Sequence, residues 1–294
     1  ARREDKPPQA SVRFTMFPTM LDVRHFGVEF TEHDVRGVCG IGQSTKDSQQ
    51  IGKFGIGFKS VYAYTERPEI HSGAEAFAIK DYVLPYACEP GPLAPRETSI
   101  RLPLRPDMPD ASDDILAALK GLGSPALLFL RRIEEISWGT DGAHSGHFLR
   151  EETNLDDLAP IVTIIGNDSE RPDDTDEEWL LFRRRVEGTE KELFVEVAFA
   201  LDRADTTADW QIRPRSQSRL TVFFPTAVDT HCGVAIQGPY KTTPSRDNVK
   251  RFDPWNHALV AQTATLIVDA LRWLRDARKL EPAVLQCLPI RRDA

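Results

Sequence analysis

The chain has 294 residues, of which 40% are hydrophobic, and it carries a formal net charge of −8 at pH 7. This length and apolar content suffice for one large domain or two ordinary domains with a buried core. The acidic balance argues against a constitutive nucleic-acid-binding protein, whose usual footprint is a basic face. Because no apolar run reaches the roughly 20 residues that span a bilayer, and the first residues lack a leader pattern, we expect a cytoplasmic protein without a membrane partner.

The spacing of the cysteines also favours a cytoplasmic protein. Cys39, Cys88, Cys232 and Cys287 lie far apart, without a CxxC pair or the spacing of metal ligands. We therefore expect reduced thiols and no metal site built from cysteine.

The first hundred residues contain short strands around one capped helix. Thr31, with Asp34 three positions later, predicts the start of a helix that ends near Gly40. Residues 43–50 are polar and without periodicity, which is typical of a mobile surface segment. Helix character returns at residues 58–64. Alternating apolar and polar residues predict strands at residues 11–17, 21–26, 69–72, 76–79 and 98–103.

The Pro- and Asp-rich residues 106–114 predict a linker. The predicted domains are therefore residues 1–105 and residues 115–294. In the second domain we expect helices at residues 115–122 and 125–135, then strands at residues 179–186, 193–201, 219–225 and 233–240. Residues 255–278 carry apolar residues at helical spacing and predict a closing amphipathic helix.

A glycine-rich stretch, IGKFGIGFKSVY, precedes the second helical segment of the first domain. It fails the P-loop pattern, because Phe58 stands where Lys must follow Gly57, and it fails the dinucleotide pattern, because Ser60 replaces the third glycine. Bare backbone N–H groups before a helix can nevertheless bind anionic oxygens. A glycine turn that serves only packing is the alternative.

The surrounding sequence reads HFGVEFTEHDVRGVCGIGQSTK and then IGKFGIGFKSVYAYTERPEIHSG. It resembles the Bergerat-fold ATPases, which include gyrase, ninety-kilodalton heat-shock chaperones, histidine kinases and mismatch-repair ATPases, and most closely their sacsin-type branch. The resemblance is dense over residues 12–73, looser over residues 97–105, and returns in AIQGPYKTTPSRDNV and the closing helix. It implies an α+β protein in which a two-layer α/β sandwich, the Bergerat ATP-binding domain, precedes a second α/β domain.

The resemblance implies a site for adenine. His25 stands where the superfamily usually has an Asp that accepts from the adenine amino group, and Gly27 is the glycine two residues on. A neutral His can also accept this hydrogen bond. Phe26 departs from the branch, which has Asn there. Thr98 matches a Thr that lies beneath adenine. Packing of His25 on Phe30, and an ordinary strand role for Thr98, are the alternatives.

The resemblance also implies phosphate contacts. Ser44, Thr45 and Lys46 fall on the nucleotide-sensing lid, although composition alone would make them a solvated loop. Gly52, Gly55 and Gly57 would carry backbone contacts to the phosphates, with Phe54 packed beneath them.

In the second domain, Arg246, with Lys241 in reserve, would bring positive charge to the γ-phosphate and stabilise the transferring phosphoryl group. Arg246 and Asp247 could instead only hold their own loop together.

The family's first motif, a helix with a catalytic Glu and a Mg²⁺-binding Asn four residues later, has no match before Ser11. Glu4 and Asp5 lie too close to Pro7 and Pro8 to serve on such a helix. We therefore expect ATP as ligand, Mg²⁺ only when that motif is supplied, and no hydrolysis by the chain as given.

The expected function is an ATP-binding, heat-shock-chaperone-like module that uses ATP as a conformational switch within a larger ATPase, with protein clients or other domains as partners. A catalytically inactive nucleotide-binding or protein-interaction module is the alternative. A DNA-directed machine is disfavoured by the acidic balance.

Overall fold

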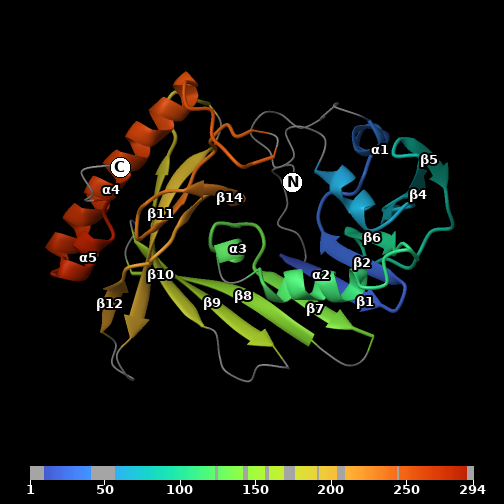
Figure 1. The fold of residues 1–294 in the computed structure, drawn as a ribbon, viewed down its shortest axis with the longest axis horizontal. Coiled ribbons are helices and arrows are strands. Elements are labelled where there is room, and N and C mark those ends of the chain that lie inside the picture. Colours follow the sequence, from blue (N-terminus) through green and yellow to red (C-terminus); the bar gives the residue numbers. More distant parts are fainter. Residues whose placement is uncertain are drawn as a thin grey trace. The chain divides into compact units, whose positions relative to one another are not determined.

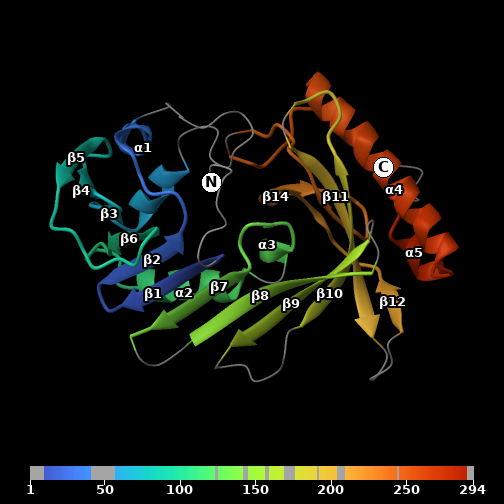
Figure 2. The same cartoon turned by 180° about the vertical axis from the view of Figure 1, so that it is seen from behind.

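The computed structural model describes residues 10–40, 57–122, 125–141, 145–155, 159–168, 176–190, 192–203, 209–243 and 245–289. Its contacts divide the chain into two units. The first unit contains residues 1–123, 131–149 and 166–174, and the second contains residues 124–130, 150–165 and 175–294. Figures 1 and 2 show the chain from opposite sides.

In the first unit the strands follow the order β8–β7–β1–β2–β6–β3–β4–β5. Neighbouring strands are antiparallel except β1 and β7, which are parallel. The strands are β1 (Ser11–Phe17), β2 (Met20–Phe26), β3 (Glu69–Ser72), β4 (Glu75–Lys80), β5 (Leu84–Ala87), β6 (Glu97–Pro103), β7 (Glu135–Thr140) and β8 (Ser145–Asn154), of which residues 150–154 belong to the second unit. The helices are α1 (Glu32–Cys39), the 3₁₀ helix η1 (Phe58–Ala63) and α2 (Ala111–Lys120).

One face of this sheet is apolar, and all three helices pack on it. Ile70, Phe77 and Ile79 form a cluster with side chains from α1 and η1. Val61 and Ile100 also contact the neighbouring cluster of Met16, Leu21 and Leu102, against which Ile115 and Leu116 of α2 pack. Because residues two apart on a strand share a face, this arrangement defines a helix-covered face and an outer face.

The second unit is a mainly antiparallel sheet in the order β14–β13–β15–β11–β10–β9, with β12 paired to β11. Its strands are β9 (Pro160–Asp168), of which residues 166–168 belong to the first unit, β10 (Glu177–Arg185), β11 (Phe194–Arg203), β12 (Trp210–Arg213), β13 (Arg219–Val222), β14 (Phe224–Asp229) and β15 (Ala235–Gln237). The helices are α3 (Pro125–Leu128), α4 (Pro254–Asp276) and α5 (Pro282–Gln286).

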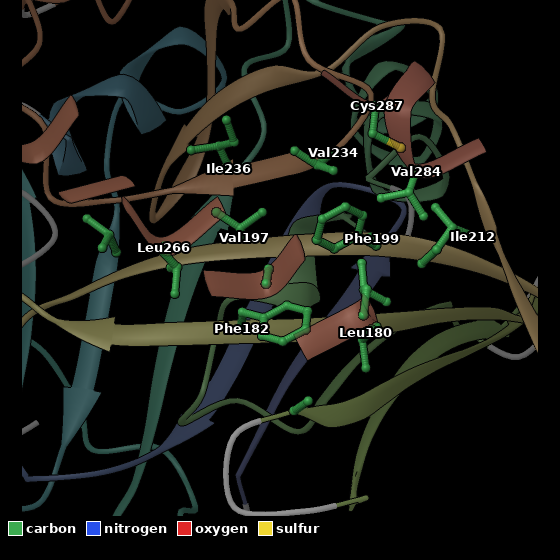
Figure 3. Close-up of a cluster of buried hydrophobic side chains, with 14 of the residues drawn as sticks. Leu180, Phe182, Val197, Phe199, Ile212, Val234, Ile236, Leu266, Val284 and Cys287 are labelled. Atoms are coloured by element: carbon green, nitrogen blue, oxygen red, sulfur yellow. The ribbon is translucent and has the colours of Figure 1, made fainter. Parts of the chain in front are cut away.

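Helix α4 covers one face of the second sheet and lies beside β11 in both views (Figures 1 and 2). It starts where the Asp253 side chain accepts a hydrogen bond from the Trp255 N–H at 2.9 Å, with Pro254 at its first position. Figure 3 shows the core beneath it, in which Leu180, Phe182, Val197 and Phe199 come from the central strands.

The expected α+β class is confirmed by these sheets and their helices. Two finer expectations need correction. The helix expected at residues 125–135 ends at Leu128, and a strand begins at Glu135 because Ile136 and Trp138 alternate into the core. Residues 106–114, expected as a linker, lie inside the first unit, because α2 begins at Ala111 and packs on the sheet.

Among the described residues, none of the helices combines the length and the apolar character that crossing a membrane requires.

Candidate nucleotide site

Three polar side chains form one row across the helix-covered face of the first sheet. His25 on β2 lies directly opposite Thr98 on β6, and Thr98 lies directly opposite Ser72 on β3. The next row, Val23, Ile100 and Ile70, belongs to the apolar face. The polar row is therefore one end of the same face, where the core gives way to hydrogen-bonding groups.

Ser72 and Thr98 are both buried and share a hydrogen bond of 2.6 Å between their hydroxyl oxygens. Ser72 Oγ also accepts from the backbone N–H of Phe30 at 3.0 Å. This second contact connects the polar row to the residues before α1. Helix α1 starts there through the expected capping box, in which the Thr31 N–H donates to the Asp34 carboxylate at 2.9 Å.

His25 is half-buried, and burial lowers its pKa, with the Phe26 backbone acting in the opposite direction. The imidazole is therefore neutral at pH 7 and has one ring nitrogen that can accept a hydrogen bond. Gly27 follows on the same strand end, and its N–H donates to the carbonyl of Arg96 at 2.9 Å. A Cβ on Gly27 would meet only His25 Nδ1, at 3.9 Å, so the fold itself leaves space at this glycine.

Gly57 is exposed and comes directly before η1, with φ of −58° and ψ of −45°. Among the described residues, a Cβ there would meet nothing within 4 Å, and the backbone conformation is open to any residue. The described part of the chain therefore contains no contact that requires glycine at this position. Ser44, Thr45, Lys46, Gly52, Phe54 and Gly55 lie outside the described residues.

Lys241 and Arg246 lie in the second unit, and both head groups are engaged there. Arg246 Nη2 donates to the carbonyls of Val222 and Phe224 at 2.9 and 2.7 Å. Lys241 Nζ lies 3.0 Å from the Asp253 carboxylate. These contacts join the loop after β15 to β13, β14 and the start of α4.

Sequence reasoning did not select Ser72. Period-two alternation in the EIHS strand places it on the same face as Ile70, but its partners belong to β6 and to the segment before α1. Only the strand register brings them together.

The donor set suits a neutral ring with hydrogen-bonding edges. His25 offers an acceptor, and the Thr98 hydroxyl can donate or accept. For a metal ion, the described parts of the chain contain no group of three or more His, Cys, Asp or Glu side chains in a suitable arrangement.

Comparison with known proteins finds a similarity in part of the first unit. The family described as Sacsin domain matches residues 27–89, which include Gly27, Gly57 and Ser72. Human sacsin is 43% identical over 60 residues, which is 20% of this chain and 1% of sacsin. Protein NO VEIN of Arabidopsis thaliana is 26% identical over 297 residues, covering 90% of this chain and 10% of that protein. The chain thus spans a small part of each relative, and its residues 27–89 are similar to the Sacsin domain.

Two solved structures share a distant likeness. The N-terminal domain of a DNA repair protein has a TM-score of 0.43 and 10% identity, over 90% of each chain. The B-subunit of DNA gyrase from Myxococcus xanthus has a TM-score of 0.41 and 10% identity, over 96% of this chain and 88% of that chain.

Proposed function

We propose that the first unit is an ATP-binding module of the Bergerat type, and that the polar row receives the adenine. The observation that carries this proposal is the strand register, which sets His25 and Thr98 side by side on the helix-covered face. Those two residues are the ones that the resemblance assigns to adenine, although they stand 73 positions apart in the sequence.

The chemistry of the row agrees with adenine. A neutral His25 nitrogen accepts from the exocyclic amino group, and the Thr98 hydroxyl donates to a ring nitrogen, directly or through water. Guanine presents an oxygen acceptor where adenine presents the amino group, so the same His25 nitrogen would face a second acceptor. The row therefore favours ATP over GTP.

The phosphates would contact backbone N–H groups of the glycine-rich segment, for which the resemblance names Gly52, Gly55 and Gly57. Ser44, Thr45 and Lys46 would close over them. When bound, ATP would supply the phosphoryl chemistry, and His25 and Thr98 would hold and orient its base.

A second candidate is a nucleotide-binding or protein-interaction module that does not hydrolyse ATP. The placement of Arg246 and Lys241 favours it, because both head groups already have partners within their own unit. A role for either residue at the γ-phosphate requires those contacts to be exchanged for phosphate. The heat-shock-chaperone-like switch remains the function we propose for the longer protein.

The test is equilibrium binding of ATP and GTP to the 294-residue chain by calorimetry. We expect ATP to bind more tightly than GTP and His25→Ala to weaken ATP by about tenfold, the loss expected for one buried hydrogen bond. His33→Ala, a change of an exposed histidine on α1, is the matched control and should leave the affinity unchanged. Equal affinity for ATP and GTP, or equal effects of the two variants, would contradict the adenine assignment.

A further inference from the structure

The Ser72 hydroxyl has no assigned role, yet it lies at the centre of the site. Ser72 is the last residue of β3 and has 0% exposure. It contacts the proposed base-binding Thr98 on one side and the main chain before α1 on the other. We infer that Ser72 is the positioning residue for the Thr98 hydroxyl and ties it to the start of α1; this inference rests on the proposed function.

The hydrogen-bonding capacity of the hydroxyl leads to this role. A serine hydroxyl has one proton and two acceptor lone pairs. One lone pair of Ser72 accepts from the Phe30 N–H. In the 2.6 Å contact with Thr98, one of the two hydroxyl groups supplies the proton and the other accepts it. When Ser72 donates that proton, Thr98 keeps its own proton for a ring nitrogen or a water. Ser72 thereby sets which hydrogen bond Thr98 can offer to a base.

The same contact fixes the side chain of Thr98. Threonine has two heavy atoms on Cβ, so a hydrogen bond to its oxygen selects one χ1 rotamer. Without Ser72 the Thr98 hydroxyl would lose the partner that holds it, and the Phe30 N–H would lose its acceptor. Ser72 Oγ therefore holds both the Thr98 hydroxyl and the segment before α1 by hydrogen bonds.

Ser99, which follows Thr98 on β6, provides a matched control for Ser72. It is also buried at 0% exposure, but its side chain lies on the outer face and donates to Asp22 Oδ1 at 2.6 Å. Ser72→Ala and Ser99→Ala thus each remove one buried serine hydroxyl from the same sheet. A purely structural role predicts similar consequences for both.

The experiment measures adenosine and ATP affinity of the 294-residue chain in a double-mutant cycle. We expect Ser72→Ala and Thr98→Val each to weaken binding about three- to tenfold, as for one hydrogen bond. The double variant should bind no more weakly than Thr98→Val alone, because Ser72 acts through Thr98. Ser99→Ala should lower the melting temperature without changing the affinity, and Ser72→Thr, which keeps the hydroxyl, should restore binding.

Amide hydrogen exchange of Phe30 is a second measurement that needs no change at Ser72. Adenosine should slow exchange of this amide in the wild-type chain and leave it unchanged in Thr98→Val. This arm keeps the test valid if Ser72→Ala fails to fold.

The outcomes separate the two proposals. Absence of ATP binding to the wild-type chain would overturn the proposed function. Normal binding by the wild-type chain with additive losses in the cycle, or a Phe30 amide that does not respond to adenosine, would overturn the positioning role and leave the function standing.

Discussion

At the scale of single residues, the proposed site depends on backbone space and on a neutral imidazole. Gly57 and Gly73 differ in the reason why glycine occupies the position. Gly73 has φ of +57°, and a Cβ there would lie 2.5 Å from Glu29 Oε2, so the local backbone itself favours glycine. Gly57 has an ordinary conformation, and the described residues leave open space around it. The proposed phosphate contact would explain a glycine at this position.

Gly57→Ala should therefore leave stability unchanged and reduce ATP affinity at least several-fold, because the new methyl group occupies space that phosphate oxygens approach. Gly73→Ala should lower stability by about 1 kcal/mol or more, because its backbone conformation disfavours a Cβ. Thermal melting and ATP titration of both variants check this. Unchanged ATP affinity in Gly57→Ala would leave that glycine without a ligand role.

His25 should make base binding dependent on pH. Burial lowers its pKa below the usual value of about 6.5, so the acceptor nitrogen is present at pH 7 and is lost only as pH falls below that value. Adenosine affinity should be constant between pH 8 and 7 and weaken under acid conditions. Adenosine is the suitable probe because it has no phosphate that titrates in this range.

His25→Gln supplies an amide oxygen that does not titrate, so it should remove the pH dependence while retaining part of the affinity. A pH dependence that persists in His25→Gln would assign the titration to another group.

At the scale of secondary-structure elements, the outer face of the first sheet carries a polar network behind the site. Arg24 Nε donates to Asp22 at 2.8 Å, and Ser99 donates to the same carboxylate. The β5–β6 connection (residues 88–96) lies against this face, where Gly91 N–H donates to His71 Nδ1 at 3.2 Å. The end of the connection also reaches the site, because the Arg96 carbonyl accepts from Gly27 N–H.

His71 should make the stability of this unit fall under acid conditions. Burial first, and then the charge of Arg101, lower its pKa, while Glu69 and Asp22 act in the opposite direction. Only the neutral ring can accept from Gly91 at Nδ1. Since the unfolded chain binds the proton more readily, stability is full above about pH 6.5 and declines below it.

Urea unfolding between pH 5 and 8 measures this decline. His71→Asn keeps an acceptor near the Nδ1 position but cannot titrate, so its stability should depend less on pH over this range. The remaining slope would include His25, whose pKa is also lowered. Equal slopes for the wild-type chain and His71→Asn would contradict the assignment.

Local patterns predicted the elements that depend on nearby residues. The strand at Ser11–Phe17, the capped start of α1 and the strand at Glu69–Ser72 were all expected, because alternation and capping act over a few positions. The strand β5 was missed, because all its residues are exposed and show no alternation. The Ser72 role depends on pairing with a strand 26 positions away, and no local pattern carries that information.

At the scale of the whole molecule, the question is whether a ligand in the first unit affects the second. The residues proposed to bind the base belong to the first unit, and Arg246 and Lys241 belong to the second. A ligand shifts a conformational equilibrium only through different affinities for its states. The switch therefore requires that ATP change contacts in the second unit, whereas a binding-only module requires no change there.

Hydrogen exchange of the 294-residue chain with and without ATP distinguishes these functions. Binding alone should slow exchange in β2, β3, β6 and the start of α1, which surround the polar row. A switch should in addition change exchange in the loop after β15, because Arg246 would exchange its carbonyl partners for phosphate.

Adenosine is the control ligand, since it occupies the base site without phosphates. A change in that loop with ATP but not with adenosine supports the switch. Protection confined to the first unit with both ligands supports the binding-only module, and an equal response of the loop to both ligands would exclude phosphate contact by Arg246 as the cause.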